Sequence, residues 1–317
     1  MNDQSPPTQA ENEAAAARRT AAIGVACGLG AYLIWGFVPL YFKSLQHAGP
    51  GLILAHRTLW SLPLIGLLVV TTGGVPRMRK LLGDAKKRRW LPVTAFLLAT
   101  NWLMFVICVV TGHVLQSSLA YFLVPLAMAL LGVFVLGERL RRLQIVGLCV
   151  AAVGVGVLVW ASGEVPWMAM IIAGSWSLYG LLRRANQTPA AEGLASELTI
   201  LSPFAAAWLL FAGPLPTETP NTSGVDLALL ALGGLVTATP LLLFGLAATR
   251  VKLATLGFLQ YLAPTIQLLL GVLLYHEPFG PRRAAAFALI WAALLVYTAD
   301  ALRHRHHHHH RTATRRD

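Results

Sequence analysis

The sequence has 317 residues, of which 56% are hydrophobic and only 12% are charged, and its mean hydropathy is +0.63. Soluble globular proteins carry about 25% charged residues, so this composition indicates a protein that folds in a lipid bilayer. The formal net charge of +12 comes from short basic clusters between long apolar runs. Because a nucleic-acid groove needs its cations on one folded surface, this pattern argues against nucleic acid as a partner.

The chain begins with a polar, alanine-rich stretch, residues 1–20, which includes Arg18 and Arg19. We expect this stretch to be a disordered cytoplasmic tail. It precedes an apolar run that has the length of a membrane span rather than of a signal peptide, so the first span is expected to remain in the protein.

Ten apolar segments follow, each close to the length of about 20 residues that a helix needs to cross the hydrocarbon. They lack the alternation of barrel strands, and lipid offers backbone groups no hydrogen-bond partner, so all ten are expected to be helical. The fold class predicted is therefore an all-α integral membrane protein with ten transmembrane helices. The expected spans are residues 22–42, 50–71, 91–111, 117–136, 143–161, 166–182, 194–212, 226–247, 256–275 and 284–301.

Lysine and arginine residues predict how these spans are oriented, because cytoplasmic loops carry most of them. With the N-terminus inside, 21 of the 25 basic residues fall on the cytoplasmic side, seven of them in the loop 77–89. Only Lys43, Arg282 and Arg283 fall outside, and Arg57 lies within a span. The sequence thus predicts a multi-pass protein of the inner (plasma) membrane with both termini in the cytoplasm.

A repeat relates the two halves of the chain. Residues 121–139 and 260–278 share seven of nineteen positions at an offset of 139, including a proline pair and the pair Glu138/Glu277. The repeat predicts a first half at residues 21–161 and a second half at residues 166–302, followed by a basic, His-rich cytoplasmic tail at 303–317. Five spans per half would invert the second half, an arrangement typical of secondary transporters. Chance matches among apolar residues are the alternative.

Several short motifs also resemble one known family. They are "AYLIWGFVPLYFK" (31–43), "AHRTLWS" (55–61), "NWLMF" (101–105), "YFLVPL" (121–126), "LGERLRR" (136–142) and "LGFLQYLAPT" (256–265). Together they resemble the RarD-type branch of the EamA transporters, in the drug/metabolite transporter superfamily, over about residues 20–302. The resemblance implies a ten-helix inner-membrane permease of two inverted EamA-like halves. Members of this branch are commonly labelled chloramphenicol-sensitivity or resistance permeases.

Residue patterns for enzyme chemistry are missing from the sequence. It has no intramembrane carboxylate pair for a divalent ion, no pair of histidines with a glutamate on one helix, and no phosphate-binding loop for ATP. The three cysteines lie in apolar runs without metal-site spacing, and the histidine run 306–310 resembles a purification tag. We therefore expect no enzyme activity, no cofactor and no metal.

Ionisable residues inside spans are costly, so they are the first candidates for function. Arg57 lies in the second span beside His56 and one turn before Trp60, a set that suits an anionic or polar ligand. The alternative for Arg57 is a side chain that reaches the outer headgroups. Glu197, near the inner end of the seventh span, is a candidate for proton coupling or gating, with an interfacial carboxylate as its alternative.

Polar and aromatic residues of other spans complete the candidate cavity. Tyr121 and Pro125 share a face of the fourth span, and the repeat places Gln260 and Pro264 at the corresponding positions of the ninth. The prolines are expected to provide flexibility; for the glutamines, bonding to a neighbouring helix is the alternative. Further residues expected to line the cavity are Trp35, Asn101, Trp102, Tyr261 and Gln267.

Two functions remain open at this point. The first is a secondary transporter, a permease or exporter that moves a small metabolite or an amphiphilic drug-like compound by alternating access without ATP. The second is a membrane-embedded enzyme or a channel-like pore. The expected partners are a small-molecule substrate, a proton if transport is proton-coupled, and the lipid bilayer. The sequence predicts neither the substrate nor the oligomeric state.

Overall fold

The structure is a computed structural model, and it describes residues 9–137, 142–211, 224–248, 250–251, 259–293 and 295–296. All regular secondary structure in these ranges is helical, as the composition predicts. Glu138, most of the connection between the seventh and eighth expected spans, parts of the ninth and tenth expected spans and the tail 303–317 lie outside the described residues.

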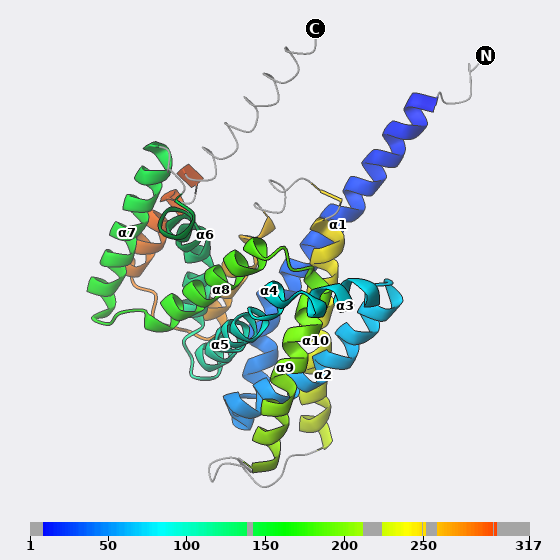
Figure 1. Ribbon diagram of the computed structural model, residues 1–317. Coiled ribbons are helices and arrows are strands. Elements are labelled where there is room, and N and C mark those ends of the chain that lie inside the picture. Colours follow the sequence, from blue (N-terminus) through cyan, green and yellow to red (C-terminus); the bar gives the residue numbers. More distant parts are fainter. Residues whose placement is uncertain are drawn as a thin grey trace, which may run out of the picture.

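The helices follow the expected spans closely in position (Figure 1). In chain order they are α1 (Gln9–Ser44), η1 (Gln46–Ala48), α2 (Pro50–Thr71), α3 (Val75–Gly83), α4 (Ala85–Arg88), α5 (Leu91–Val110), α6 (Val114–Leu136), α7 (Arg142–Ser162), α8 (Trp167–Ala185), α9 (Ala190–Phe211), α10 (Gly224–Ala248), α12 (Leu262–Leu269) and the π-helix η2 (Leu270–Leu274). A further helix occupies residues 281–293.

The N-terminal stretch differs from its expectation. Residues 9–20 were expected to belong to a disordered tail, but they form the first turns of α1, which begins at Gln9. Five of these twelve residues are alanines, which have the highest helix propensity, and the apolar span that follows supplies a helix to extend.

Five helical stretches in the described residues are long and apolar enough to cross a membrane. They are Ala16–Ser44, Pro50–Thr71, Ala85–Val110, Ala190–Phe211 and Asp226–Ala247. The bent pair Val114–Val124 and Leu126–Val135 makes a sixth if it is one span. The protein is thus an all-α, multi-pass membrane protein, while the expected total of ten spans stays a prediction.

The helices pack into one bundle in which distant segments lie side by side. α1 packs against α10 and α12, and α8 packs against α5 and α6. α2 packs against α9 and α10, and α9 also packs against α5 (Figure 1). α7 lies close to the helix at 281–293, because a Cβ at Gly154 would come within 2.9 Å of Ile290.

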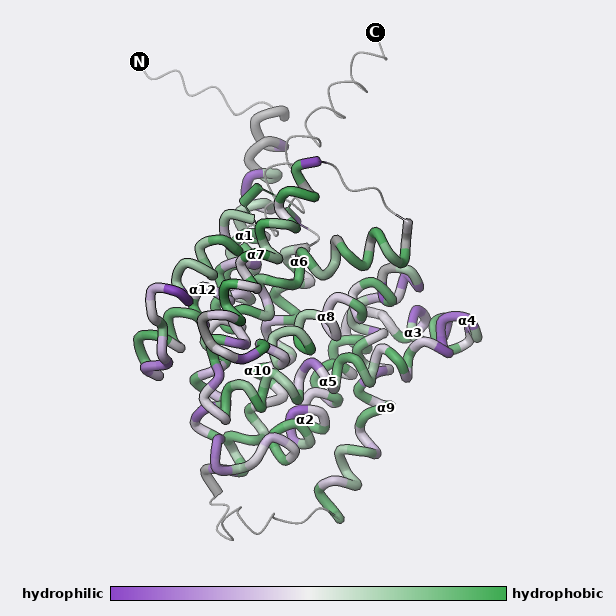
Figure 2. Tube along the Cα trace, turned by 90° about the vertical axis from the view of Figure 1, so that its left-hand side faces the viewer, coloured by the Kyte–Doolittle hydropathy of each residue, from purple (hydrophilic) through white to green (hydrophobic). Residues whose placement is uncertain are grey.

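Large apolar side chains also point outward. Phe134 is 82% exposed and Phe211 is 86% exposed, far more than a water-soluble surface usually tolerates in such number. Figure 2 shows hydrophobic residues along the long helices, with hydrophilic ones gathered at turns such as those around α3 and α4. This is the distribution expected when lipid surrounds the helices.

In the part of the chain that the structure describes, a proline coincides with a change in helix geometry at two places. α6 bends by 42° between Val124 and Leu126, at Pro125, where the missing N–H removes a helical hydrogen bond. The turn at residues 260–261 precedes α12, and Pro264 lies in the first helical turn, where no N–H donor is needed. Of the predicted proline pair, Pro125 therefore lies at a bend within a helix and Pro264 lies at the start of a helix.

Candidate functional site

Arg57 of α2 directs its side chain between other helices. Its Nε donates a hydrogen bond to Thr237 Oγ1 of α10 at 2.7 Å. Its guanidinium carbon lies 4.1 Å from the centre of the Trp102 ring of α5 and 5.5 Å from that of the Phe42 ring of α1. A guanidinium over an aromatic face is stabilised by roughly 0.5–2 kcal/mol. These partners lie on three other helices, whereas a snorkelling arginine directs its charge to the headgroups.

No carboxylate among the described residues forms an ion pair with Arg57. The ion pairs found in this part of the chain are His47–Asp226, Arg77–Glu192 and Arg183–Glu197. Since a charged residue at the centre of a span costs about 2.5–3.5 kcal/mol on insertion scales, an arginine without a counter-ion among the described residues is the first candidate for a functional role.

Two adjacent glycines explain why α10 comes so close to Arg57. A Cβ at Gly234 would lie 2.6 Å from the carbonyl oxygen of Trp60, and a Cβ at Gly233 would lie 2.8 Å from the hydroxyl of Tyr41. Only glycine permits this approach of α10 to α2 and α1. Thr237 lies one turn further on, and its hydroxyl also donates to the carbonyl of Gly233 at 2.8 Å.

His56 and Trp60 pair with each other rather than with the partners of Arg57. The indole Nε1 of Trp60 lies 3.3 Å from His56 Nδ1, one helical turn away. Trp60 is 45% exposed, so this pair lies along the side of α2. The structure therefore separates the expected trio into an inward arginine and an outer His–Trp pair.

An aromatic cluster surrounds Trp35 of α1. The Trp35 ring lies 5.4 Å from that of Tyr32 and 5.9 Å from that of Phe244 of α10, measured between ring centres. Trp35 keeps part of its surface accessible. α1 and α10 thus carry aromatic side chains on the same facing surfaces that hold Phe42 and Thr237.

Tyr121 of α6 lies close to the arginine. Its ring centre is 5.9 Å from that of Phe105, which in turn lies 6.0 Å from Phe42. The hydroxyls of Tyr121 and Tyr41 both lie within electrostatic range of Arg57. The structure thus brings together Arg57, Trp102 and Tyr121 from the expected set and adds Tyr41 and Thr237.

Asn101 and Gln267 instead join helices to one another. Asn101 is 2% exposed, and its Nδ2 donates to the carbonyl of Ile172 of α8 at 2.9 Å. Gln267 is 1% exposed, donates to the Trp35 carbonyl at 3.1 Å and accepts from Ser117 Oγ at 3.4 Å. For Gln267 this is the alternative named above, a bond to neighbouring helices.

The remaining ninth-span residues lie near the break before α12. Gln260 and Tyr261 form the turn there and are partly buried, and Tyr261 packs against the apolar core. The carbonyl of Pro264 accepts a hydrogen bond from Ser118 Oγ of α6 at 2.8 Å. A serine of a neighbouring helix therefore supports the backbone beside this proline.

Glu197 of α9 lies in a separate polar network. It is fully buried, and its Oε2 accepts from the Tyr179 hydroxyl at 2.9 Å and from Arg183 Nη1 at 3.2 Å. Its Oε1 has no hydrogen-bond partner among the described residues, although Thr94 is near enough to interact with the carboxylate. The paired Arg183 makes this a compensated charge, unlike Arg57.

Two ion pairs tie helices together at their ends. Arg77 of α3 donates through Nε to Glu192 Oε1 of α9 at 2.6 Å, and Glu192 is 3% exposed. His47 of η1 lies 3.0 Å from Asp226 of α10, measured from Nε2 to Oδ1. Both pairs join segments that are more than 100 residues apart in the sequence.

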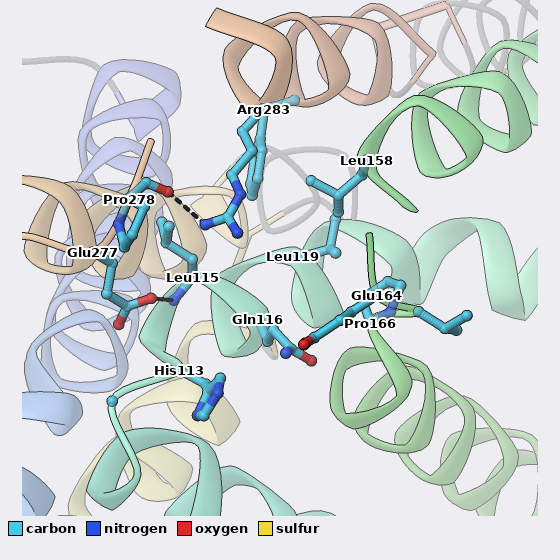
Figure 3. Close-up of a pocket in the computed structure, with 13 residues that line it drawn as sticks. His113, Leu115, Gln116, Leu119, Leu158, Glu164, Pro166, Glu277, Pro278 and Arg283 are labelled. Carbon is cyan, nitrogen blue, oxygen red and sulfur yellow. Dashed lines mark hydrogen bonds between the residues drawn. The ribbon is translucent and has the colours of Figure 1, made fainter. Parts of the chain in front are cut away.

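A pocket of about 240 Å³ opens where α6 begins (Figure 3). Glu277 lines it, and its carboxylate accepts hydrogen bonds from the backbone N–H groups of Val114 and Leu115 at 2.6 and 3.0 Å. Gln116, Glu164 and Arg283 line other parts of it. Because the Glu277 carboxylate already caps α6, this glutamate has a structural role at the helix start.

No cluster of three or more metal-binding side chains occurs in the part of the chain that the structure describes. Sequence reasoning missed Thr237, Tyr41 and Tyr179, because a lone threonine or tyrosine in a helix gives no signal without its partner. Sequence reasoning also found no indication that Arg183 belongs to a polar network, although Tyr179 precedes it by one helical turn.

Taken together, the fold is that of a multi-pass helical membrane protein with an arginine held between its helices. Comparison with known proteins assigns it further. Residues 22–160 match the model of the EamA-like transporter family. The chain is 43% identical to "Protein RarD" of Streptomyces exfoliatus, over 93% of this chain and 92% of that protein. It is 41% identical to an uncharacterized transporter of Vibrio cholerae, over 88% of this chain and 93% of that protein.

A solved crystal structure shares the fold. It aligns with 88% of this chain and 97% of its own, with a TM-score of 0.57 at 24% identity. The sequence relatives carry the assignment: the chain belongs to the EamA-like transporter family, as a RarD-type permease. The resemblance noted from short motifs is confirmed.

Proposed function

We propose that this protein is a secondary transporter, which moves a small metabolite or an amphiphilic compound across the bacterial cell membrane by alternating access and without ATP. The observation that carries the proposal is Arg57, an arginine without a counter-ion among the described residues, held by side chains of α1, α5 and α10. Keeping a charge between membrane helices costs free energy. This cost is expected where the charge binds a solute that enters the site from each side of the membrane in turn.

Helix packing supports a carrier built from two inverted halves. Under the repeat, α1 corresponds to α8, α2 to α9, α5 to α10 and α6 to α12. The contacts of α1 with α10 and α12 then correspond to the contacts of α8 with α5 and α6. In the same way, the contact of α2 with α10 corresponds to the contact of α9 with α5. The pairs α2–α9 and α6–α12 map onto themselves. Arg57 then lies where the halves meet, as transporter sites do.

Counterflow in proteoliposomes tests the proposal. A thermal-shift screen of metabolites against the purified protein selects a probe, and labelled probe outside is then exchanged against unlabelled probe inside. A carrier accumulates label transiently without net flux, a pore only equilibrates it, and an enzyme converts it. Counterflow that is absent for every probe that binds would reject alternating access.

Arg57 variants link the activity to the site. Arg57→Ala and Arg57→Lys should both reduce counterflow by at least about tenfold, because lysine cannot present a planar fork of donors. Protein yield and thermal stability should stay near those of the wild type. Wild-type counterflow by both variants would show that Arg57 does not serve the transport path.

A further inference from the structure

The hydrogen-bonding capacity of Arg57 is largely unused within the protein. Arginine carries five N–H donors, and among the described residues only its Nε has a hydrogen-bond partner, Thr237. The two Nη groups form the planar end of the fork, and Arg57 as a whole residue is half-buried. The guanidinium carbon lies 4.1 Å from the centre of the Trp102 ring, whereas the N–H donors of a guanidinium point outward in its own plane.

Apolar surface extends from this cation along α1 and α10. Thr237 and Phe244 of α10 are seven residues apart and share one helical face, as do Trp35 and Phe42 of α1. Seven residues of helix span about 10 Å. The Trp35–Phe244 contact therefore lies about two turns from the arginine, between α1 and α10.

We propose that the transported substrate is an organic anion with an apolar body. Its carboxylate, or a group of the same planar shape, binds the Nη groups of Arg57 as a bidentate pair and supplies the missing negative charge. Its apolar part extends toward Trp35 and Phe244. This inference rests on the proposed transport function and names the chemical class of its substrate.

The charge of the substrate sets the direction of transport. A cell interior that is negative repels anions, and about 100 mV shifts the distribution of a monovalent anion about 50-fold outward. An anion carrier without a coupling ion therefore exports its substrate unless the outside concentration exceeds the inside one by more than about 50-fold. The neutral amide of the same acid has no such bias.

Matched acid–amide pairs test the site by binding. The probes are 3-phenylpropanoate with 3-phenylpropanamide and hexanoate with hexanamide, titrated against purified protein by thermal shift and isothermal calorimetry. The wild type should bind at least one acid at least tenfold more tightly than its amide. Arg57→Gln should lose this preference, and Arg57→Lys should keep only a part of it.

Arg282→Gln is the matched control. Arg282 also places its guanidinium over a tryptophan, at 4.6 Å from the Trp160 ring, but at an exposed position away from the helix interior. Its loss should leave the acid preference unchanged. If no acid binds, if acid and amide bind equally, or if Arg57→Gln keeps the preference, the anion site is refuted.

Transport with the same probes separates the two proposals. In vesicles with an imposed potential of about 100 mV, the acid should distribute about 50-fold toward the positive side, and its direction should reverse with the sign of the potential. Counterflow of the amide alone would overturn the anion assignment and leave the transporter intact. Binding of the acid by Arg57 without counterflow of any probe would support the anion site and reject the carrier.

Discussion

Glu277 shows how a single side chain can join two parts of the chain that are 163 residues apart. It follows η2 and caps α6, so it holds these two distant segments together at a helix start. The carboxylate is partly buried there, which sets a conflict between desolvation and hydrogen bonding.

Burial raises the pKa of the Glu277 carboxyl above its usual 4.5, although the N–H groups of Leu115 and Val114 act to lower it. A carboxyl whose pKa is higher in the folded than in the unfolded state keeps its proton longer in the folded protein. Its contribution to stability therefore falls as the pH rises from about 4.5 through the folded pKa. We expect the wild type to lose stability relative to Glu277→Gln over that interval and the difference to level off above it.

Thermal unfolding of both proteins in detergent between about pH 4 and 8 measures this difference, because all other titrating groups are shared. Parallel curves would show that the folded pKa is not raised. A wild type that gains stability relative to the glutamine variant as the pH rises would show that the helix-capping bonds dominate.

At the scale of elements, the contact of α10 with α2 depends on glycine. Gly234→Ala should destabilise the protein by roughly 1–3 kcal/mol, because its Cβ would meet the Trp60 carbonyl oxygen at 2.6 Å and backbone must move to accommodate it. Gly66→Ala in α2 is the control, since nothing lies within 4 Å of its Cβ position.

Replacing Gly66 should be neutral or stabilise by up to about 1 kcal/mol through helix propensity. Measured in the same detergent, the melting temperature of Gly234→Ala should therefore lie below that of the wild type, and that of Gly66→Ala should equal or exceed it. Equal stability of Gly234→Ala and the wild type would mean that α10 does not pack this closely on α2.

Element positions could be predicted well from hydrophobicity, since α2 coincides with the segment 50–71 and α5 ends one residue before the expected position. Helix ends that depend on tertiary contacts could not. α9 begins at Ala190 rather than at residue 194, and its first turn contains Glu192, whose partner Arg77 lies 115 residues away. The π-turn of η2 likewise has no local sequence signal.

The residues of the candidate site likewise fall into those that the sequence predicts and those that depend on tertiary contacts. The energetic cost of a charge in a span singled out Arg57 from sequence alone. Its partners could not be predicted, because which face of α10 meets α2 follows from the Gly233–Gly234 contact and not from periodicity. His56 was grouped with Arg57 by adjacency, but successive helical residues point in different directions.

For the whole molecule, the distribution of basic residues predicts that both termini are cytoplasmic. Phosphatase fusions should be inactive after residues 80, 140, 184 and 252 and active after residues 113, 164 and 219. An active fusion within the loop 77–89 would overturn this orientation, since that loop carries seven basic residues.

With this orientation, the two ion pairs that join helix ends lie on opposite sides of the membrane. Arg77–Glu192 joins the region before α5 to the start of α9, and His47–Asp226 joins the connection before α2 to the start of α10. If the two halves are exchanged through the repeat, the segments that one ion pair joins correspond to the segments that the other ion pair joins. An alternating carrier must separate each of them in turn.

Cross-linking at the position of each of these two ion pairs therefore tests the alternating-access mechanism. In a background without Cys27, Cys108 and Cys149, the double replacements Arg77→Cys/Glu192→Cys and His47→Cys/Asp226→Cys are treated with a short, reducible bifunctional thiol reagent. Linkage at either end should reduce counterflow at least about tenfold, because the carrier can then open to one side only. Reduction of the cross-link should restore counterflow. The reagent should leave counterflow by the single-cysteine variants unchanged. Full counterflow by a linked protein would mean that these ends stay together during transport, and that the solute passes without the alternate opening on which the carrier assignment depends.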